Sequence, residues 1–400
     1  MFKKLRVQPP LQQGATLAIV LLAIECLDEW VYGARSVALP LMQQELHLSY
    51  TQLGLLSTIP DWVSNLAEPV LGIWADAGRR RRCIAWGGVA FGAALGLVGL
   101  SPRWAALLIA FCLLHPASGA FVSLSQAMLM DLERDRHELN MARWMVASSV
   151  GVVAGALSCS AVVFWGGNWR WVFGGLAILS WGLVLVFQRV SAAVPVETAV
   201  PDVLPTNSFW HGVRQALAAL RRPVIWRWLL LVQLADLMLD IFTDLLPLYL
   251  VSAARFSEAE AGLAVALCSG IDLLGSVLLI PLLPRVDARA YLRITALLLL
   301  VAFPTFLLVP SALVKLAMLC LISLGRSAWY PILTAQLYAA LPNQSSLVLS
   351  LSTLTGQISP LMPLLLGMVA DRLGLTTALW VLLLGPISLL LGVPSRSNIQ

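Results

Sequence analysis

The sequence predicts an all-α membrane protein whose twelve transmembrane helices form two pseudo-symmetric six-helix bundles. The first observation is composition: 59% of the 400 residues are hydrophobic and only 12% are charged, with a mean hydropathy of +0.84. Soluble domains are nearer half apolar and a quarter charged. The second observation is a series of long apolar runs, and the third is the placement of basic residues between these runs. Together they exclude an ordinary soluble protein.

A transmembrane helix needs about 20 consecutive, mostly apolar residues to cross the hydrocarbon core of a bilayer. The chain contains twelve runs of roughly this length or longer, and we expect each to form one membrane-spanning helix. The expected spans are residues 15–42, 49–75, 83–101, 104–131, 142–166, 170–189, 225–251, 259–284, 291–309, 311–341, 345–370 and 374–393.

Basic residues support this count, because cytoplasmic loops of membrane proteins carry an excess of lysine and arginine. With the N-terminus inside, 19 of the 26 lysines and arginines fall in segments on the cytoplasmic side. The basic stretch Met1 to Arg6 precedes a long span with no small-residue cleavage site, which indicates an uncleaved cytoplasmic end. We therefore expect a multi-pass protein of the inner or plasma membrane with both termini in the cytoplasm.

The chain divides near its middle, where residues 190–224 form the longest polar connection. This connection includes a basic stretch, His211 to Arg222, that we expect to lie on the membrane surface. The predicted domains are an N-terminal six-helix bundle at residues 1–189, a cytoplasmic linker at 190–224 and a C-terminal six-helix bundle at 225–400.

The two halves share a weak symmetry of acidic residues. The first span contains several carboxylates, and the seventh contains Asp236, Asp240 and Asp244. Asp61 in the second span corresponds to Asp272 in the eighth. Two similar six-helix halves with ionisable groups near the membrane midplane are typical of secondary transporters.

The first span carries a stripe of polar side chains within an otherwise apolar run. One charged side chain near the bilayer centre costs on the order of 2.5–3.5 kcal/mol on insertion scales, so the stripe must face protein or water. One interpretation is a buried ion pair that only holds helices together. The other is that the excess acids are protonated, or are paired with another helix or a substrate, because the acids outnumber the one base. The stripe shares one helical face and consists of Glu25, Asp28, Glu29, Tyr32 and Arg35.

The segment from Gly72 to Arg82, after the second span, resembles the loop signature G-x-L-A-D-R-x-G-R-[KR] of the major facilitator superfamily. It is one residue shorter and has Trp74 in place of the leucine. The resemblance implies the major facilitator fold and a cytoplasmic gate; a generic basic loop is the alternative. The residues expected in this gate are Gly72, Asp76, Gly78, Arg79 and Arg80.

Other motifs agree with the resemblance. Gly367 to Gly374 fits G-x-x-x-D-R-x-G, a string that family members often carry between the last two spans. His115 stands where many family antiporters have arginine, and it adds a titratable group. Gly151 and Gly155 form a G-x-x-x-G helix-packing pattern. Four features are similar to the efflux proteins of the fosmidomycin-resistance type: the acidic first span, the stretch Leu39 to Leu41, the stretch Leu48 to Gly54, and His115 with Pro116.

In the family fold, the first, fourth, seventh and tenth helices line a central cavity. The resemblance therefore places a set of polar and aromatic residues at a proton-coupling or substrate-binding site. Arg326 needs an acidic partner, for which an aspartate of the seventh or eighth span is the natural choice; an anionic substrate is the minority alternative. The candidates are Glu25, Asp28, Glu29, Arg35, His115, Asp236, Asp240, Asp272 and Arg326, with the cavity aromatics Trp30, Tyr32, Trp329 and Tyr330.

The function we expect is secondary active transport by alternating access: proton-coupled export of a small amphipathic or cationic compound, because acids exceed bases in the spans. Alternatives are a uniporter or symporter importing a sugar, organic acid or lysolipid, or a non-transporting membrane sensor. No phosphate-binding loop, nucleophile motif or Cys/His cluster occurs, so we expect no catalytic residue, no metal and no cofactor beyond the proton gradient. The expected partners are a small-molecule substrate, protons and the lipid bilayer, with no nucleic acid and a monomeric state.

Overall fold

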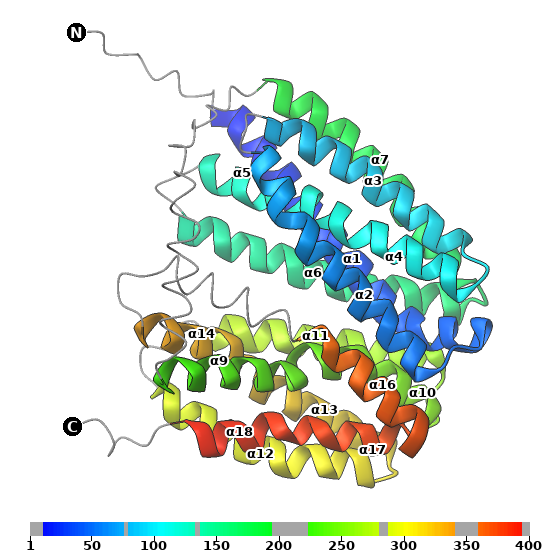
Figure 1. The fold of residues 1–400 in the computed structure, drawn as a ribbon, viewed down its shortest axis with the longest axis vertical. Helices are drawn as coiled ribbons and strands as arrows, with labels where there is room; N and C mark the ends of the chain where they lie inside the picture. The colour runs from blue at the N-terminus through cyan, green and yellow to red at the C-terminus, as the bar shows by residue number, and fades with distance from the viewer. Residues whose placement is uncertain are drawn as a thin grey trace. The chain divides into compact units, whose positions relative to one another are not determined.

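The computed structural model describes residues 11–75, 79–132, 137–193, 223–279, 287–340 and 359–393, and within these residues every regular element is a helix (Figure 1). In the N-terminal half the helices are α1 (Leu11–Leu46), α2 (Tyr50–Trp74), α3 (Arg80–Leu100), α4 (Trp104–Ser118), η2 (Gly119–Ser123), α5 (Leu124–Leu132), α6 (His137–Phe164) and α7 (Trp169–Ala193). In the C-terminal half they are α9 (Pro223–Asp236), η4 (Leu237–Ile241), α10 (Phe242–Ser252), α11 (Glu258–Leu279), α12 (Ala288–Leu308), α13 (Ala312–Arg326), α14 (Trp329–Ala340), α16 (Leu361–Leu373), α17 (Leu375–Trp380), η6 (Val381–Leu383) and α18 (Leu384–Gly392).

Most predicted spans coincide with these helices within a few residues. Seven helices of the described residues are long and apolar enough to cross a membrane. The predicted span 311–341 is divided at Ser327 and Ala328, where α13 ends before α14 begins. Much of the predicted span 345–370 and the whole basic stretch 211–222 lie outside the described residues.

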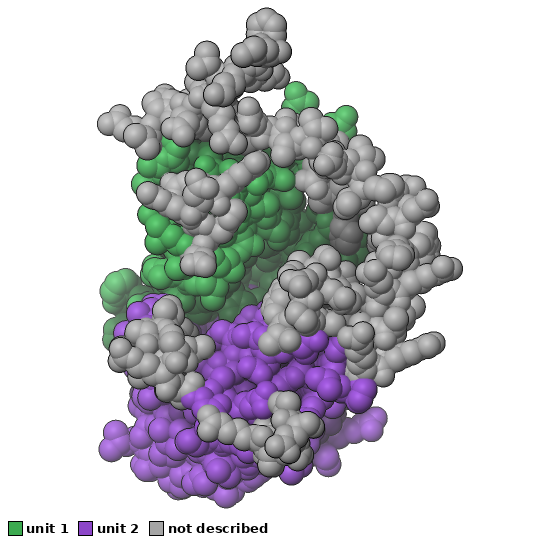
Figure 2. Space-filling view, turned by 90° about the vertical axis from the view of Figure 1, so that its left-hand side faces the viewer, with its two compact units in different colours: residues 1–35, 59–202 green, residues 36–58, 203–400 purple. Residues whose placement is uncertain are grey.

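The chain forms two compact units, coloured separately in Figure 2. Unit 1 comprises residues 1–35 and 59–202, and unit 2 comprises residues 36–58 and 203–400. The C-terminal part of α1 and the N-terminal part of α2, residues 36–58, thus group with the second unit, whereas the sequence placed both helices wholly in the first bundle. The boundaries predicted at 189 and 225 remain a prediction.

In unit 1, α3 packs against both α4 and α7. The helices are close together because glycines of α3 face large side chains. A Cβ on Gly88 would lie only 2.4 Å from the nearest side-chain atom of Val184 and 2.7 Å from that of Phe121, which is too close for a real contact. The ring centroids of Phe91 and Phe121 are 5.8 Å apart, and both side chains are fully buried. This apolar core fixes α4, which contains His115.

In unit 2, α12 packs against α13 and α18, while α9 packs against α18 and α14. Phe242, Phe303 and Phe306 form a buried aromatic cluster with centroid distances of 5.5 to 6.2 Å. Aromatic pairs in such edge or tilted arrangements stabilise a core beyond the area that they bury. The cluster lies directly beside α13, which positions Arg326.

Among the described residues, the fourth and seventh predicted spans each contain a short π-helical segment. The first, η2, follows Pro116 in the fourth predicted span, and the second, η4, contains Asp240 in the seventh. A π segment shifts the hydrogen-bond ladder of a helix and is frequent at functional sites. Both segments lie beside the ionisable groups described next.

Candidate functional site

The acidic stripe of α1 divides between two neighbouring helices of unit 1. Ser118 on α4 donates a 2.7 Å hydrogen bond to Oδ1 of Asp28. Glu25 and Glu29, one turn apart, both hydrogen-bond Ser148 on α6, and Glu25 also contacts Trp144. Hydroxyl and indole groups thus donate hydrogen bonds to these three carboxyl groups, and Glu25 is 5% exposed.

Glycines bring α6 onto α1. A Cβ on Gly155 would collide with the carbonyl oxygen of Trp30, and one on Gly151 would collide with that of Cys26. Gly33 on α1 makes the reciprocal close approach to the backbone of α6. The G-x-x-x-G pattern is therefore a helix-packing device, and the contact that it makes holds the acidic stripe against α6.

His115 connects three helices. Its Nδ1 lies 2.8 Å from Oδ1 of Asp61 on α2, and its Nε2 lies 3.5 Å from a guanidinium nitrogen of Arg35 on α1. Arg35 also stacks over the ring of Phe111, with its Cζ 5.5 Å from the ring centroid. Asp28 interacts electrostatically with His115. The imidazole is thus surrounded by two carboxyl groups and one fixed cation.

Arg326 in unit 2 makes the corresponding ion pair. It donates a 2.6 Å hydrogen bond to Oδ2 of Asp272, so the eighth predicted span supplies its acidic partner. It also donates to the carbonyl oxygens of Met238 and Leu239, at 2.5 and 2.7 Å. Both carbonyls belong to η4, where the π geometry makes backbone acceptors available to a side chain. Arg326 is 3% exposed, so these bonds compensate a buried charge.

The three aspartates of the seventh predicted span lie on one side of the helix, around η4. Ser359 donates a 2.5 Å hydrogen bond to Asp236. Asp240 is in hydrogen-bonding contact with Asp236 and interacts electrostatically with Asp244 and Arg326. Two carboxyl groups can share a hydrogen bond only if one of them holds a proton. This pair is therefore a second candidate for proton binding.

The ion pairs of the two halves are related by a constant step along the chain. Asp61 and His115 are 54 residues apart, as are Asp272 and Arg326. Asp272 follows Asp61 by 211 residues, and Arg326 follows His115 by the same 211 residues. The second pair therefore occupies the place of the first in an internal repeat, with arginine in place of histidine.

The same step of 211 residues relates the acids of the first and seventh spans. It takes Glu25 to Asp236 and Glu29 to Asp240. Both positions related by this step are acidic in each case. In the first span Glu25 and Glu29 share Ser148 as a partner, and in the seventh Asp236 and Asp240 contact each other. Four ionisable positions of the first half, Glu25, Glu29, Asp61 and His115, thus have an ionisable counterpart 211 residues later.

The remaining predicted residues lie in varied surroundings. Trp30 donates a 2.8 Å hydrogen bond to Ser158, and Tyr32 is half-buried on α1. Trp329 is fully buried and donates to Thr295, whereas its neighbour Tyr330 is 61% exposed.

Of the predicted gate residues, Gly72 lies in α2 and Arg79 stacks over Trp74. Arg80 forms a 2.5 Å ion pair with Asp131 at the end of α5. Asp76 and Gly78 lie outside the described residues. In the part of the chain that the structure describes, no group of three His, Cys, Asp or Glu side chains could hold a metal ion.

Two charged residues inside the predicted spans were not identified from the sequence. Glu68 on α2 accepts a 2.9 Å hydrogen bond from Ser64 and lies beside Gly119 at the start of η2. Lys315 is 3% exposed and donates to the hydroxyl of Tyr249 and to a backbone carbonyl. The signal that could have found both is their charge within an apolar span.

An aspartate of α16 caps α2. The backbone N–H groups of Tyr50 and Thr51 donate 2.8 Å hydrogen bonds to the two carboxylate oxygens of Asp371. Gly367, one turn before Asp371, makes close contact with the backbone of Tyr50. The string from Gly367 to Gly374 thus joins two helices within unit 2, with glycine for close approach and a carboxylate at a helix N-terminus.

Comparison with known proteins identifies the family. The sequence profile of the Major Facilitator Superfamily matches residues 21–363. The chain belongs to the major facilitator superfamily. A curated relative, the fosmidomycin resistance protein of Escherichia coli (strain K12), is 26% identical over 151 residues, which are 36% of each chain. The match thus spans about a third of that relative's length.

Solved structures of this superfamily share the fold. A bacterial homolog of the human lysosomal transporter Spinster, inward-facing and unoccupied, has a TM-score of 0.72 at 16% identity, covering 96% of this chain and 95% of that one. The nucleoside transporter NupG has a TM-score of 0.71 at 14% identity, covering 96% of this chain and 98% of that one. The peptide transporter POT in complex with sulfate has a TM-score of 0.71 at 14% identity, covering 94% of each chain.

These findings confirm the predicted fold class, an all-α membrane protein with the major facilitator fold. They also establish the general activity: the protein is a secondary transporter embedded in a lipid bilayer.

Proposed function

We propose that this transporter is a proton-coupled exporter of a small amphipathic or cationic compound, driven by the proton gradient across the cell membrane. The observation that carries the proposal is that histidine stands in one of two corresponding acid–base pairs, His115 with Asp61, where the other, Arg326 with Asp272, has arginine. Arginine stays protonated in proteins, whereas histidine exchanges its proton in the physiological range. The first half therefore has a removable charge where the second has a fixed one.

A further difference between the halves supports the same assignment. Asp28, which interacts with His115, corresponds in the repeat to Leu239, so the first half has one extra carboxyl group. Leu239 instead offers its backbone carbonyl to Arg326. A fixed cation held by carbonyls suits a structural anchor, and a histidine between carboxyl groups suits proton exchange.

The exchange follows from charge balance. When His115 and the neighbouring carboxyl groups hold protons, the acidic stripe is neutral and a cation is released. When these protons leave, Asp28 and Glu29 regain negative charge and attract a cation, with Trp30 offering an aromatic face. Proton and substrate would then compete for the same carboxyl groups, which is the requirement for antiport.

Export is favoured by the name of the curated relative, a resistance protein. We further propose that the protein is a monomer with both termini in the cytoplasm, that it resides in the inner or plasma membrane, and that protons and one small molecule are its partners. The predicted cytoplasmic gate around Arg79 and Arg80 belongs to this proposal.

The test is proton flux in liposomes that contain a pH-sensitive dye. A proton gradient is imposed, and a panel of cationic, anionic and neutral amphiphiles is added. Wild-type protein should move protons when a substrate is present, and Asp28→Asn and Asp240→Asn should abolish this movement. Glu45→Gln, which neutralises an exposed acid of α1, is the matched control and should behave as wild type. Substrate flux without proton movement, unchanged in both aspartate variants, would overturn the proposal.

A further inference from the structure

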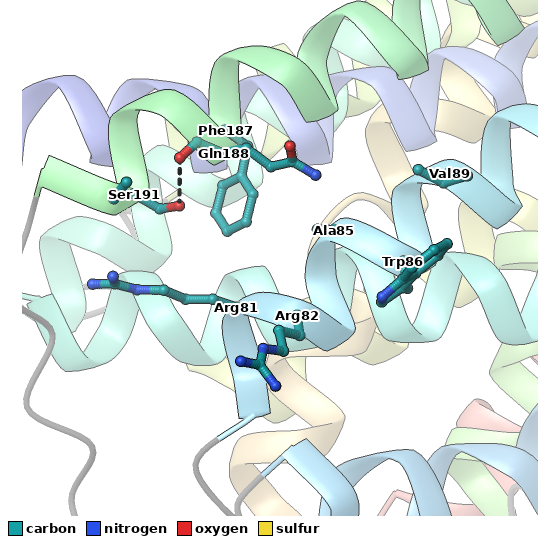
Figure 3. Close-up of a pocket in the computed structure, with 9 residues that line it drawn as sticks. Arg81, Arg82, Ala85, Trp86, Val89, Phe187, Gln188 and Ser191 are labelled. Atoms are coloured by element: carbon teal, nitrogen blue, oxygen red, sulfur yellow. Dashed lines mark hydrogen bonds between the residues drawn. The ribbon is translucent and has the colours of Figure 1, made fainter.

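A cavity of about 390 Å³ lies between α3 and α7, away from the acidic site. It is lined by Arg81, Arg82, Ala85, Trp86, Val89, Phe187, Gln188, Ser191 and Ala192. Figure 3 shows side chains of both helices around this space, with the Phe187 ring pointing from α7 toward α3. None of these residues has a part in the proposed proton exchange.

The lining changes from basic to apolar along α3. Arg81 and Arg82 lie in the first turn, Trp86 follows one turn later, and Val89 follows after a further turn. Trp86 is 68% exposed, which is unusual for so large an apolar side chain unless it meets lipid or a partner. Arginine, tryptophan and aliphatic residues in this order match the headgroup, interface and acyl regions of one bilayer leaflet.

The α7 side continues the same order. Gln188 and Ser191 add polar groups at the arginine end, where the Ser191 hydroxyl donates to the carbonyl of Gln188 at 3.4 Å (Figure 3). Further along the helix, Leu185 and Trp181 are 59% and 43% exposed. An apolar surface therefore leads away from the cavity along α7, as it does along α3.

We propose that this cavity binds the headgroup of an anionic phospholipid, with its phosphate at Arg81 and Arg82 and its acyl chains along the exposed apolar surface. Basic pockets between transmembrane helices are recognised sites for anionic headgroups. Arginine is suited to this role because its planar guanidinium binds phosphate oxygens in pairs. A soluble phosphorylated compound would have no use for the apolar surface that continues from the cavity.

The test is lipid retention, measured by native mass spectrometry of the purified full-length protein with equal amounts of phosphatidylglycerol and phosphatidylcholine. Wild-type protein should retain phosphatidylglycerol, and the double variant Arg81→Gln/Arg82→Gln should retain at least fivefold less. Arg189→Gln is the matched control, because Arg189 is an exposed arginine at the same end of α7 that does not line the cavity. If the double variant retained as much phosphatidylglycerol as wild type, or if Arg189→Gln lost as much as the double variant, the lipid would be attracted only by the general positive charge at this end of α3 and α7. Either result would overturn the proposed site.

A second measurement locates the lipid and distinguishes it from a soluble phosphate. Phosphatidylglycerol brominated in its acyl chains should quench the fluorescence of wild-type protein more than that of Trp86→Phe, and glycerol phosphate should not compete. Equal quenching in the two proteins, or full competition by glycerol phosphate, would contradict a lipid in this cavity.

Discussion

Oδ1 of Asp61 lies 2.8 Å from Nδ1 of His115, joining α2 to α4 in the first half of the transporter. The same chain separation of 54 residues joins Asp272 to Arg326 in the second half. The same chain separation with different bases implies different roles for the two pairs. The pair with the permanently charged base, Arg326 with Asp272, should contribute to the stability of the fold. The pair with histidine, His115 with Asp61, should couple proton movement to transport.

The ion pair of Arg326 with Asp272 predicts a large loss of stability when one partner is removed. Asp272→Asn leaves the buried guanidinium of Arg326 without its carboxylate, and breaking such a pair costs about 3–5 kcal/mol. Unfolding in mixed micelles, followed by intrinsic fluorescence, measures this loss. The double variant Asp272→Asn/Arg326→Gln should be more stable than Asp272→Asn alone. A double variant less stable than both single variants would show that the two side chains do not act as a pair.

The contact between α1 and α6 predicts a strong effect of one methyl group. Gly155→Ala places a Cβ on the carbonyl oxygen of Trp30, and such overpacking costs about 1–3 kcal/mol. Gly96→Ala on α3 is the control, because a Cβ there meets no atom within 4 Å. We expect a lower melting temperature for Gly155→Ala only. Equal melting temperatures for the two variants would mean that α6 does not approach α1 so closely.

The cap on α2 predicts a pH-dependent contribution to stability. Desolvation works to raise the pKa of Asp371, but hydrogen bonds from Thr51, Tyr50 and Ser49 outweigh it and hold the pKa below its usual value. A lowered pKa in the folded state stabilises the protein above the unfolded value, about pH 4, and this stability is lost as the pH falls through the folded pKa.

Asp371→Ala should therefore lower the melting temperature at pH 7, by an amount equivalent to about 1 kcal/mol for a helix cap. The difference from wild type should stay constant down to about pH 5 and shrink below pH 4. Melting curves of both proteins at several pH values provide the measurement. A difference that grows as the pH falls would have the wrong sign for a capping carboxylate.

The sequence was sufficient to predict most of the helices, because a membrane span has a length and an apolarity that local composition reveals. It also predicted an acidic partner for Arg326, because a buried guanidinium requires one. It could not predict how the α1 stripe divides, with Asp28 facing α4 and Glu25 facing α6. That division depends on which helix approaches closest, and the approach is decided by glycines on both helices.

The π segments also escaped prediction, although they decide what Arg326 contacts. Nothing in the residues of η4 distinguishes them from an ordinary helix in the sequence. In the structure, Met238 and Leu239 of this segment accept hydrogen bonds from Arg326. The capping role of Asp371 is a similar case, because its partners Tyr50 and Thr51 are over 300 residues away in the chain.

The most direct test of the account is proton coupling in His115→Arg, which gives the first half the fixed base of the second. The variant should fold, since arginine can pair with Asp61 as Arg326 pairs with Asp272. In liposomes with a pH-sensitive dye, we expect substrate-dependent proton movement to fall at least tenfold, because the fixed charge of arginine can be neither released nor regained. Undiminished proton movement in His115→Arg would contradict the assignment of coupling to His115.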